Sequence, residues 1–513
     1  MLILCLGSEY FHQSLQQMGH SVLIPPHQEG YPVDKIFNSL QDRPDLVIFT
    51  DHLGVHVFPE GLTNVYGIPK IYYAVDTPIN YWWQIHYAHL FDYTFTDQKP
   101  LAQTLTSMGL KSSWLPVGVD TKSYLPSSNE NPGQVYDFGF VGSLDPARRL
   151  KRTRLVETLS NRFTIKTAGS HQEGWVNPQE SSQIYRQSRL ALNESLFSGV
   201  TTRMLEAMAS GSVLFTEKAG GDLGELFKAG EDFAWFEPAE VIDVANSWLG
   251  DDKRRRRAAK RSLEKVTAAH DISHRAETLI NTIRRVHYGH AQVDCEGWDR
   301  EGRAMFLTSL RWPQEGGKNR MIRAEVLLEK AYNSDRISPN GLFMLGHIKR
   351  MRHNLSKGAE YLSAAFELGE PRGALGMAIL KLGEGDLVES RRWFNLFTQS
   401  QDCPELSKDT LPFELVKMLA KRLVEIGEEV TPGFSRMKHD PTVWNAFEFY
   451  QSAFSGKPDD LEVGIALSEL LMKHGAAAEA MEIAQKALEY HPENERLGEV
   501  FTLAGRASYL TVN

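Results

Sequence analysis

Short apolar runs alternate with segments of helical periodicity from the start of the chain to about residue 216, and this alternation limits the fold more than any other feature. Strands that alternate with helices form a parallel sheet covered by helices on both faces. Residues 1–117 therefore predict an N-terminal Rossmann-like domain. Its expected strands are residues 2–6, 22–24, 46–50, 70–73 and 93–96, with helices such as 11–18 and 100–108 between them.

A polar stretch rich in Ser, Asn, Pro and Gly, residues 127–133, separates this series from a second one. Beyond about Ala258 the strand pattern ends, and the apolar residues of 272–286 recur at helical spacing. We therefore expect a second Rossmann-like domain at residues 118–290 and an all-α region at 291–513. The strands expected in the second domain are residues 136–141, 164–167, 190–192 and 213–216.

The all-α region contains a period of 34 residues, which is that of tetratricopeptide repeats. The aromatic positions of that repeat are mostly missing, so helical hairpins without true repeats are the alternative. Either interpretation predicts an α-solenoid or a helical bundle. The residues at this spacing are Pro458 and Pro492, Ala324 and Gly358, Leu328 and Leu362, and Ala331 and Ala365, and small residues stand at Gly475, Ala480 and Ala487.

Composition and charge exclude several classes of protein. With 513 residues, of which 42% are hydrophobic and 24% charged, the chain belongs among folded globular proteins. A net charge of -9 argues against sequence-independent binding to nucleic acid. The three cysteines, Cys5, Cys295 and Cys403, are too far apart for a disulfide framework or a metal cluster. Without a signal peptide or a long apolar stretch, we expect a cytoplasmic protein with no membrane span.

A basic run and an aromatic run could each bind a ligand, but each also has a purely structural explanation. The basic run at residues 251–257 is interleaved with Ala258, Ala259 and Leu263, so we expect a solvated helix face rather than a nucleic-acid site. The aromatic run at residues 81–83 could stack on a sugar ring or lie in the core. The turn at Gly7 lacks the G-x-G-x-x-G pattern, which disfavours a nicotinamide or flavin dehydrogenase.

The most informative segment is residues 192–211, where a strand leads into a hydroxyl-rich loop and a short helix that Gly211 ends. Helix N-termini present free N–H groups, so Thr201, Thr202 and Arg203 could hold a phosphate. Glu206, one turn on, could accept the hydroxyls of a ribose. A capped helix with an Arg203–Glu206 pair is the alternative, although a capping box would place Glu only three residues after a Ser or Thr.

This segment resembles the donor-site signature of glycosyltransferases with two Rossmann-like domains, the GT-B fold, and especially the spore-protein CgeB-like family. The resemblance covers about residues 1–290. Many retaining relatives in the wider fold carry two glutamates eight residues apart, whereas Ser198 stands eight before Glu206, so retaining or inverting chemistry stays open. The other matching motifs are residues 72–78, residues 140–143 with Arg148 and Arg149, and residues 270–275.

The resemblance implies a nucleotide-sugar donor site in the second domain and an acceptor side in the first. It implies no metal and no cofactor, with a UDP-sugar as the expected donor. Arginines and helix-end N–H groups would then stabilise the departing diphosphate where a metal otherwise would. The expected donor-binding residues are Gly142, Ser143, Arg148, Arg149, Thr201, Thr202, Arg203 and Glu206.

Inverting transfer needs a base that removes the proton of the acceptor hydroxyl. Asp76 is the leading candidate because strand ends in such domains point into the cleft between them. An Asp76 that caps the turn at Pro78 is the alternative. Asp51, His52 and His86 are rivals, each expected to be a loop or surface residue.

The sequence therefore predicts an α/β protein with two Rossmann-like domains and a tetratricopeptide-like solenoid, acting as a glycosyltransferase. The acceptor hydroxyl is expected on a protein, such as flagellin or another surface protein, that the repeats recruit. A non-catalytic adaptor with a degenerate scaffold and a nucleotide-sugar epimerase are the alternatives. Gly142, Arg203 and Glu206 favour an enzyme, and a repeat array suits an epimerase poorly.

Overall fold

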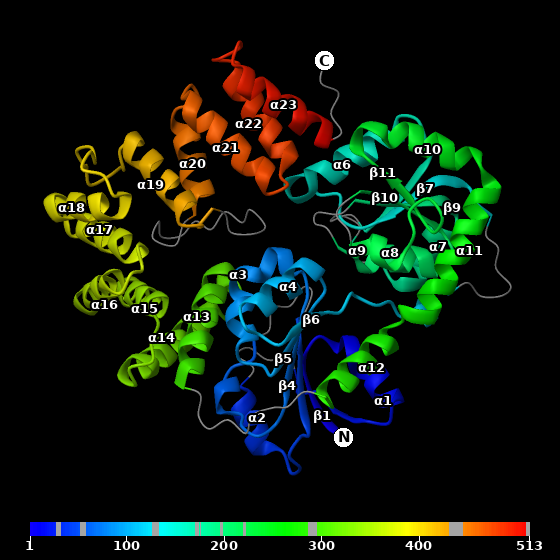
Figure 1. Ribbon diagram of the computed structural model, residues 1–513, viewed down its shortest axis with the longest axis horizontal. Helices are drawn as coiled ribbons and strands as arrows, with labels where there is room; N and C mark the ends of the chain where they lie inside the picture. The colour runs from blue at the N-terminus through cyan, green and yellow to red at the C-terminus, as the bar shows by residue number, and fades with distance from the viewer. Residues whose placement is uncertain are drawn as a thin grey trace. The chain divides into compact units, whose positions relative to one another are not determined.

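Two parallel sheets precede an all-helical region in the computed structural model of the chain (Figure 1). The predicted fold class is thereby confirmed. None of the described helices combines the length and the apolar character needed to cross a membrane. The structure describes residues 1–26, 32–51, 58–125, 133–169, 174, 176–194, 199–218, 222–285, 295–429 and 445–508.

The first sheet has six strands in the order β2-β1-β3-β4-β5-β6, and the pairs from β2 to β5 are parallel. All five expected strands are present within one residue of their predicted bounds, and β6 was not predicted. The strands are β1 (Leu2–Gly7), β2 (Ser21–Leu23), β3 (Leu46–Thr50), β4 (Lys70–Ala74), β5 (Tyr93–Thr96) and β6 (Ser112–Trp114). The helices are α1 (His12–Gln17), α2 (Val33–Ser39), α3 (Thr77–Ala88) and α4 (Lys99–Ser107), with the short η2 (Leu62–Asn64).

The second sheet has five parallel strands in the order β11-β10-β9-β7-β8. Strand β8, which follows β7 in sequence, lies on one side of β7, and the next strand, β9, lies on its other side. The strand order therefore reverses between β7 and β9. The strands are β7 (Tyr136–Val141), β8 (Ile165–Ala168), β9 (Ser188–Asn193), β10 (Val213–Glu217) and β11 (Ala234–Phe236). The helices are α5 (Thr121–Tyr124), α6 (Pro146–Ser160), α7 (Pro178–Arg186), α8 (Thr202–Ala209), α9 (Asp222–Leu226), α10 (Val241–Gly250), α11 (Asp252–Ala269) and α12 (Ile272–Ile283).

Helices of the C-terminal region pack mainly as consecutive pairs. Leu328 and Leu362, which are 34 residues apart, have equivalent contacts: a Cβ at Gly302 would lie 2.8 Å from Leu328 Cγ, and one at Gly346 would lie 2.8 Å from Leu362 Cγ. The two glycines are 44 residues apart, so these contacts do not follow the 34-residue period, and membership in the tetratricopeptide family stays a prediction. The helices are α13 (Cys295–Arg311), α14 (Lys318–Asn333), α15 (Pro339–Met351), α16 (Leu355–Glu367), α17 (Arg372–Glu384), α18 (Leu387–Thr398), α19 (Phe413–Glu425), α20 (Ala446–Gly456), α21 (Leu461–Lys473), α22 (Ala477–Leu488) and α23 (Glu495–Ala507).

The chain forms two compact units, and the helical region is divided between them. The first unit holds residues 1–96, 101–113 and 283–463, and therefore combines the first sheet with α13 to α20. The second holds residues 97–100, 114–282 and 464–513, and combines the second sheet with α22 and α23. The three expected domains, 1–117, 118–290 and 291–513, stay a prediction about how the chain is organised.

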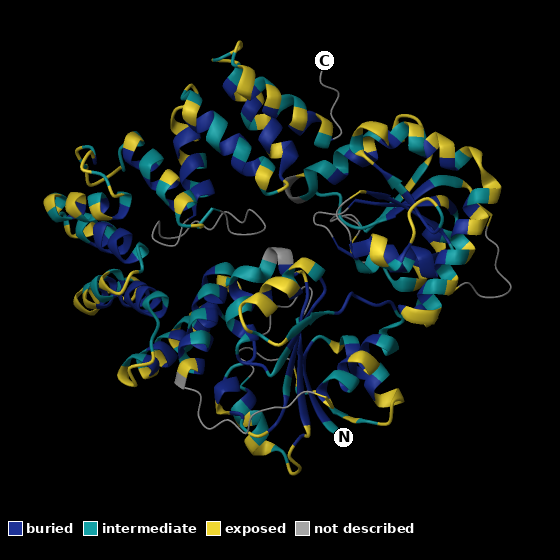
Figure 2. Cartoon of the chain, in the orientation of Figure 1, coloured by how far each residue is buried: buried dark blue, intermediate teal, exposed yellow. Residues whose placement is uncertain are grey.

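A single hydrophobic core runs through the first unit, from the first sheet into α13 to α17. Buried strands and helix faces form this interior in Figure 2. Trp83 of α3 is buried against Phe58, Tyr87 and Trp312, so for Trp83 the core interpretation of the aromatic run is confirmed. Burial of such large side chains is among the strongest contributions to folding.

A buried carboxylate also joins the first helical pair to the first sheet. Glu301 of α13 is fully buried and accepts hydrogen bonds from the backbone N–H of Gly61 (2.6 Å) and from Thr63 Oγ1 (2.9 Å). These two donors stand at the start of η2. Burial raises the pKa of Glu301, and the hydrogen bonds from Gly61 and Thr63 oppose that rise.

We predict that Glu301→Ala lowers the free energy of unfolding by about 2–4 kcal/mol, because two buried donors lose their acceptor. Urea unfolding followed by circular dichroism measures the change. Glu296→Ala is the matched control on the same helix, where the side chain is 58% exposed, and it should stay within about 0.5 kcal/mol of wild type. Equal effects of the two substitutions would contradict the role of Glu301.

Candidate active site

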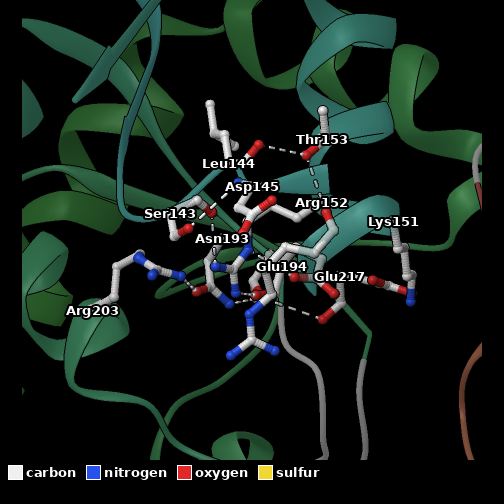
Figure 3. Close-up of polar contacts among 12 residues, drawn as sticks. Ser143, Leu144, Asp145, Lys151, Arg152, Thr153, Asn193, Glu194, Arg203 and Glu217 are labelled. Atoms are coloured by element: carbon white, nitrogen blue, oxygen red, sulfur yellow. Dashed lines mark hydrogen bonds and ion pairs between the residues drawn. The ribbon is translucent and has the colours of Figure 1, made fainter. Parts of the chain in front are cut away.

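The carboxyl ends of β7 and β9 bring the expected donor-binding residues together. Gly142 follows β7 directly, and Glu194 follows β9. In open parallel sheets, ligands bind in the crevice where the strand order switches, which here lies between these two strands. Figure 3 shows the polar contacts at this edge of the second sheet.

Gly142 and Arg203 are in direct contact, although they are far apart in sequence. Gly142 has a φ of +149°, and a Cβ at this position would lie 2.5 Å from Arg203 Nη2. Its own N–H donates to Ala168 O at 2.8 Å, which fixes the turn after β7. Only glycine fits here, because any side chain would displace the guanidinium.

Neutral oxygens hold the Arg203 side chain (Figure 3). Nε donates to Val141 O at 2.6 Å and Nη1 donates to Asn193 Oδ1 at 3.3 Å, while the guanidinium lies 4.9 Å from the centre of the Phe140 ring. Among described residues, Arg203 forms no ion pair, so the alternative of an Arg203–Glu206 pair is not observed. A full positive charge therefore stands at the first turn of α8, where free N–H groups also favour an anion.

The hydroxyls beside this arginine differ in their contacts. Thr201 is the N-cap of α8, yet its Oγ1 is buried, caps nothing and has no partner in the described part of the chain. Thr202 is the first residue of α8 and is partly buried. Ser143 follows Gly142, and its Oγ accepts from Asp145 N at 3.4 Å.

Glu206 lies one turn into α8, partly buried, where the hydroxyl of Tyr124 donates to its carboxylate. Burial raises the pKa of Glu206, while Tyr124 and the charge of Arg203 act in the opposite direction. Tyr185 packs against Ala207, the residue that follows Glu206, and burial together with the charge of Glu206 raises the pKa of its hydroxyl. Neither tyrosine was singled out in the sequence, because each comes from a helix remote in the chain.

Arg152, which the sequence analysis missed, reaches the site where Arg148 or Arg149 was expected. Its side chain is buried, and its Nε lies 3.0 Å from Glu194 Oε2 while its Nη1 donates to Ser143 O at 3.3 Å. Burial lowers the pKa of Arg152 to about 10, with the charge of Arg203 adding to the effect. Helical spacing was the available signal, because a residue three or four after Arg148 or Arg149 shares their face.

Arg148 and Arg149 are less well defined as ligand groups. The side chain of Arg148 lies outside the described residues. Arg149 interrupts α6 with a non-helical backbone, φ −140° and ψ 46°, and its N–H donates to Asp145 O at 2.7 Å. Next to Arg152, Lys151 pairs with Glu217 at 2.6 Å at the end of β10.

Asp76 belongs to the first unit and follows β4 by two residues. It is exposed and has a left-handed backbone, with φ 51° and ψ 37°, and no side-chain capping bond to α3. The alternative of a carboxylate that caps the following turn is therefore not observed. Left-handed backbone in a residue other than glycine is uncommon, and such strain concentrates at functional sites.

The rivals of Asp76 have other roles or lie elsewhere. Asp51 accepts hydrogen bonds from Tyr72 Oη at 2.9 Å, from Val75 N at 3.1 Å and from Gln84 Nε2 at 2.5 Å, so it is a structural carboxylate and not a simple loop residue. His86 is partly buried on α3, and the prediction of a surface residue was wrong. Burial and the charge of Arg303 hold the pKa of His86 well below its usual range. His52 lies outside the described residues.

The late histidine and arginine that matched the resembled family have structural contacts. Arg275 donates to Pro116 O at 2.7 Å and to Ala269 O at 3.0 Å, and its Nη2 lies 2.7 Å from His270 Nδ1. Burial, with the charge of Arg275, lowers the pKa of His270 to about 4. A neutral histidine and Arg275 therefore help to hold residues 116–119 against residues 270–275 at the start of α12.

The basic run forms the first turns of α11 and is largely a solvated face, as predicted. Arg256 has a side chain that is 82% exposed. Arg255 is the exception, because it is buried and its Nη1 donates to Trp248 O at 2.6 Å.

Residues 148–281 match the family model described as Glycosyl transferase-like. This range runs from α6 to α12 and includes β9 and α8. The match lies within the second Rossmann-like domain and covers less than half of the chain. No protein of curated function is found to match this chain.

Three solved structures are similar over about half of the chain. Sucrose-phosphate synthase from Thermosynechococcus elongatus has 12% identity and a TM-score of 0.42, with 55% of this chain and 98% of that chain covered. HepE from Anabaena, in complex with UDP and glucose, has 14% identity and a TM-score of 0.40, with 56% and 100% covered. The pneumococcal O-GlcNAc transferase GtfA, in complex with UDP and GlcNAc, has 14% identity and a TM-score of 0.36, with 50% and 59% covered.

Proposed function

We propose that the chain is a metal-independent glycosyltransferase of the GT-B type, CgeB-like in its first 290 residues. It transfers a sugar from a nucleoside-diphosphate sugar, with UDP-sugars as the first candidates, to a hydroxyl group on a protein. The observation that carries the proposal is the position of Arg203. This cation has no ion-pair partner among described residues and stands at a helix N-terminus where the strand order of the second sheet switches.

The donor's diphosphate fits this position for electrostatic reasons. When the bond between the sugar and the diphosphate breaks, its electron pair stays with the diphosphate, so negative charge grows there in the transition state. Arg203 and the N–H groups of Thr201 and Thr202 are fixed before the reaction, because α8 and the two strand ends hold them. Glu206 lies one turn further on and is assigned to the ribose.

We predict that Arg203→Ala weakens the binding of UDP about 10–100-fold, because a charge-assisted hydrogen bond contributes roughly 1.5–3 kcal/mol. Isothermal titration calorimetry on the full chain measures the affinity. Arg189→Ala is the matched control, since this arginine stands at the amino end of β9, paired with Asp137 at 3.2 Å. If Arg203→Ala binds UDP with the affinity of wild type, the diphosphate does not bind at Arg203.

The catalytic base proposed for inverting transfer is Asp76. It is exposed, and its strained backbone at the end of β4 suits a residue selected for its side chain and not for stability. The carboxylate would take the proton from the acceptor hydroxyl as that oxygen attacks the sugar carbon.

Asp76→Asn should abolish transfer and leave UDP affinity unchanged, because the amide keeps the shape of the carboxylate and loses its basicity. Asparagine also tolerates the left-handed backbone, so the melting temperature should stay near that of wild type. The readout is initial-rate transfer from a labelled UDP-sugar. Turnover at the wild-type rate in Asp76→Asn would assign the base to another residue.

The helical region is proposed to recruit the protein acceptor. Its α18 borders an open hollow of about 890 Å³, and the apolar side chains that line it with polar ones include Val388, which is 80% exposed, and Leu396. Large exposed apolar side chains grouped in a groove are typical of sites that bind polypeptides. A bacterial surface protein such as flagellin is the acceptor class we propose. Cys5 and Cys403 are buried free thiols, which suits action in the reducing cytoplasm.

We predict that Val388→Glu with Leu396→Glu lowers sugar transfer into protein at least tenfold, because two charges in the groove oppose apolar docking. Label from UDP-sugars in a cell extract is measured in protease-sensitive material, with hydrolysis of the donor as the internal reference. Val326→Glu, on the exposed face of α14, is the matched control. Label in free sugar or lipid would contradict a protein acceptor, and no turnover of any donor would favour the non-catalytic adaptor.

A further inference from the structure

Three short helices of the second unit surround the carboxylate of Glu206. Tyr124 ends α5, Tyr185 lies in α7, and Glu206 itself lies in α8, and each pair of these helices is in contact. The Tyr124 hydroxyl donates to Glu206. The backbone of Tyr124 is tied to α7, because Ser182 Oγ donates to its carbonyl oxygen at 2.9 Å.

The hydroxyl of Tyr185 is the unusual group in this arrangement. Its ring is fully buried against Ala191, Ala207 and Val141, yet its Oη has no hydrogen-bond partner among the described residues. Burial raises the pKa of Tyr185, the charge of Glu206 raises it further and Arg203 opposes this. The Tyr185 ring packs against Ala207, the residue that follows Glu206. The ring is thus fixed by packing while its polar end is left unsatisfied.

An unsatisfied buried hydroxyl destabilises the folded chain, and folded proteins keep few of them. Here two such groups adjoin the same helix, because Thr201 Oγ1 at the start of α8 is also buried without a partner in the described part of the chain. Thr201 stands two residues before Arg203, and Tyr185 packs against the residue that follows Glu206; Arg203 and Glu206 are the residues assigned to the donor. A ligand that supplies the missing partners explains why a phenylalanine does not stand at 185.

We propose that Tyr185 is a specificity-determining residue for the ribose of the donor. This inference rests on the proposed function, in which Glu206 binds the ribose. A carboxylate can only accept hydrogen bonds, so the ribose hydroxyl donates to Glu206. A phenol can donate, so Tyr185 can donate a hydrogen bond to the oxygen of that same hydroxyl. The ribose takes the place of the Tyr124 hydroxyl on Glu206 and so reaches Tyr185. Glu206 and Tyr185 together then select a ribonucleotide over its deoxy analogues.

The test compares the full chain with its Tyr185→Phe variant in calorimetric titrations with UDP, 2′-deoxy-UDP and 3′-deoxy-UDP. Wild type should discriminate against at least one deoxy analogue, because that analogue leaves Tyr185 unpaired. In Tyr185→Phe, UDP affinity should fall roughly tenfold. The ratio of the affinity for UDP to the affinity for that deoxy analogue should fall towards one. The melting temperature without ligand should stay level or rise, because the unsatisfied hydroxyl is gone. Tyr136→Phe, at the amino end of β7, is the matched control and should behave as wild type.

Unchanged discrimination ratios in Tyr185→Phe would overturn the inference, as would a drop in melting temperature with UDP affinity unaltered. Neither result would affect the proposed function, because wild type would still bind UDP. If wild type binds neither UDP nor another nucleoside diphosphate, the proposed function fails first and the role of Tyr185 fails with it.

Discussion

The contact of Arg203 with the turn after β7 is the interaction on which the site depends. One guanidinium joins the last carbonyl of β7 to the last side chain of β9, and it is itself part of α8. It fits only because residue 142 has no side chain. Three elements that come from distant parts of the sequence are therefore held in one geometry, and the N-terminus of α8 faces the crevice between the strands as a result.

Two other cations at this edge are paired with carboxylates. Arg152 is paired with Glu194, and Lys151 with Glu217. Buried ion pairs of this kind add little net stability, but removal of one partner is strongly destabilising, so they fix local structure. Arg203 differs because its partners are neutral oxygens. An anion that enters the crevice meets a cation that forms no ion pair with a carboxylate among the described residues, within a frame that need not rearrange.

Much of the fold and part of the site followed from sequence patterns. Both strand series appeared because buried parallel strands are continuous apolar runs. Strands β6 and β11, of three residues each, were missed, although β2 is equally short and was predicted. Gly142 and Arg203 were found by motif, but their contact was not, since pairing between remote segments leaves no local trace. The same holds for Tyr124 and Tyr185, whose importance comes from tertiary packing around Glu206.

The continuous core of the first unit has a consequence for how such proteins can diversify. Side chains from the first sheet and from α13 to α17 are buried in one cluster, with the Glu301 carboxylate inside it. The early helices are thus part of the first sheet's own fold and not an attached module. Recombination that exchanged the whole helical region would separate two halves of one interior and yield an insoluble chain. Lineages that acquire new targets must instead vary surface residues in place.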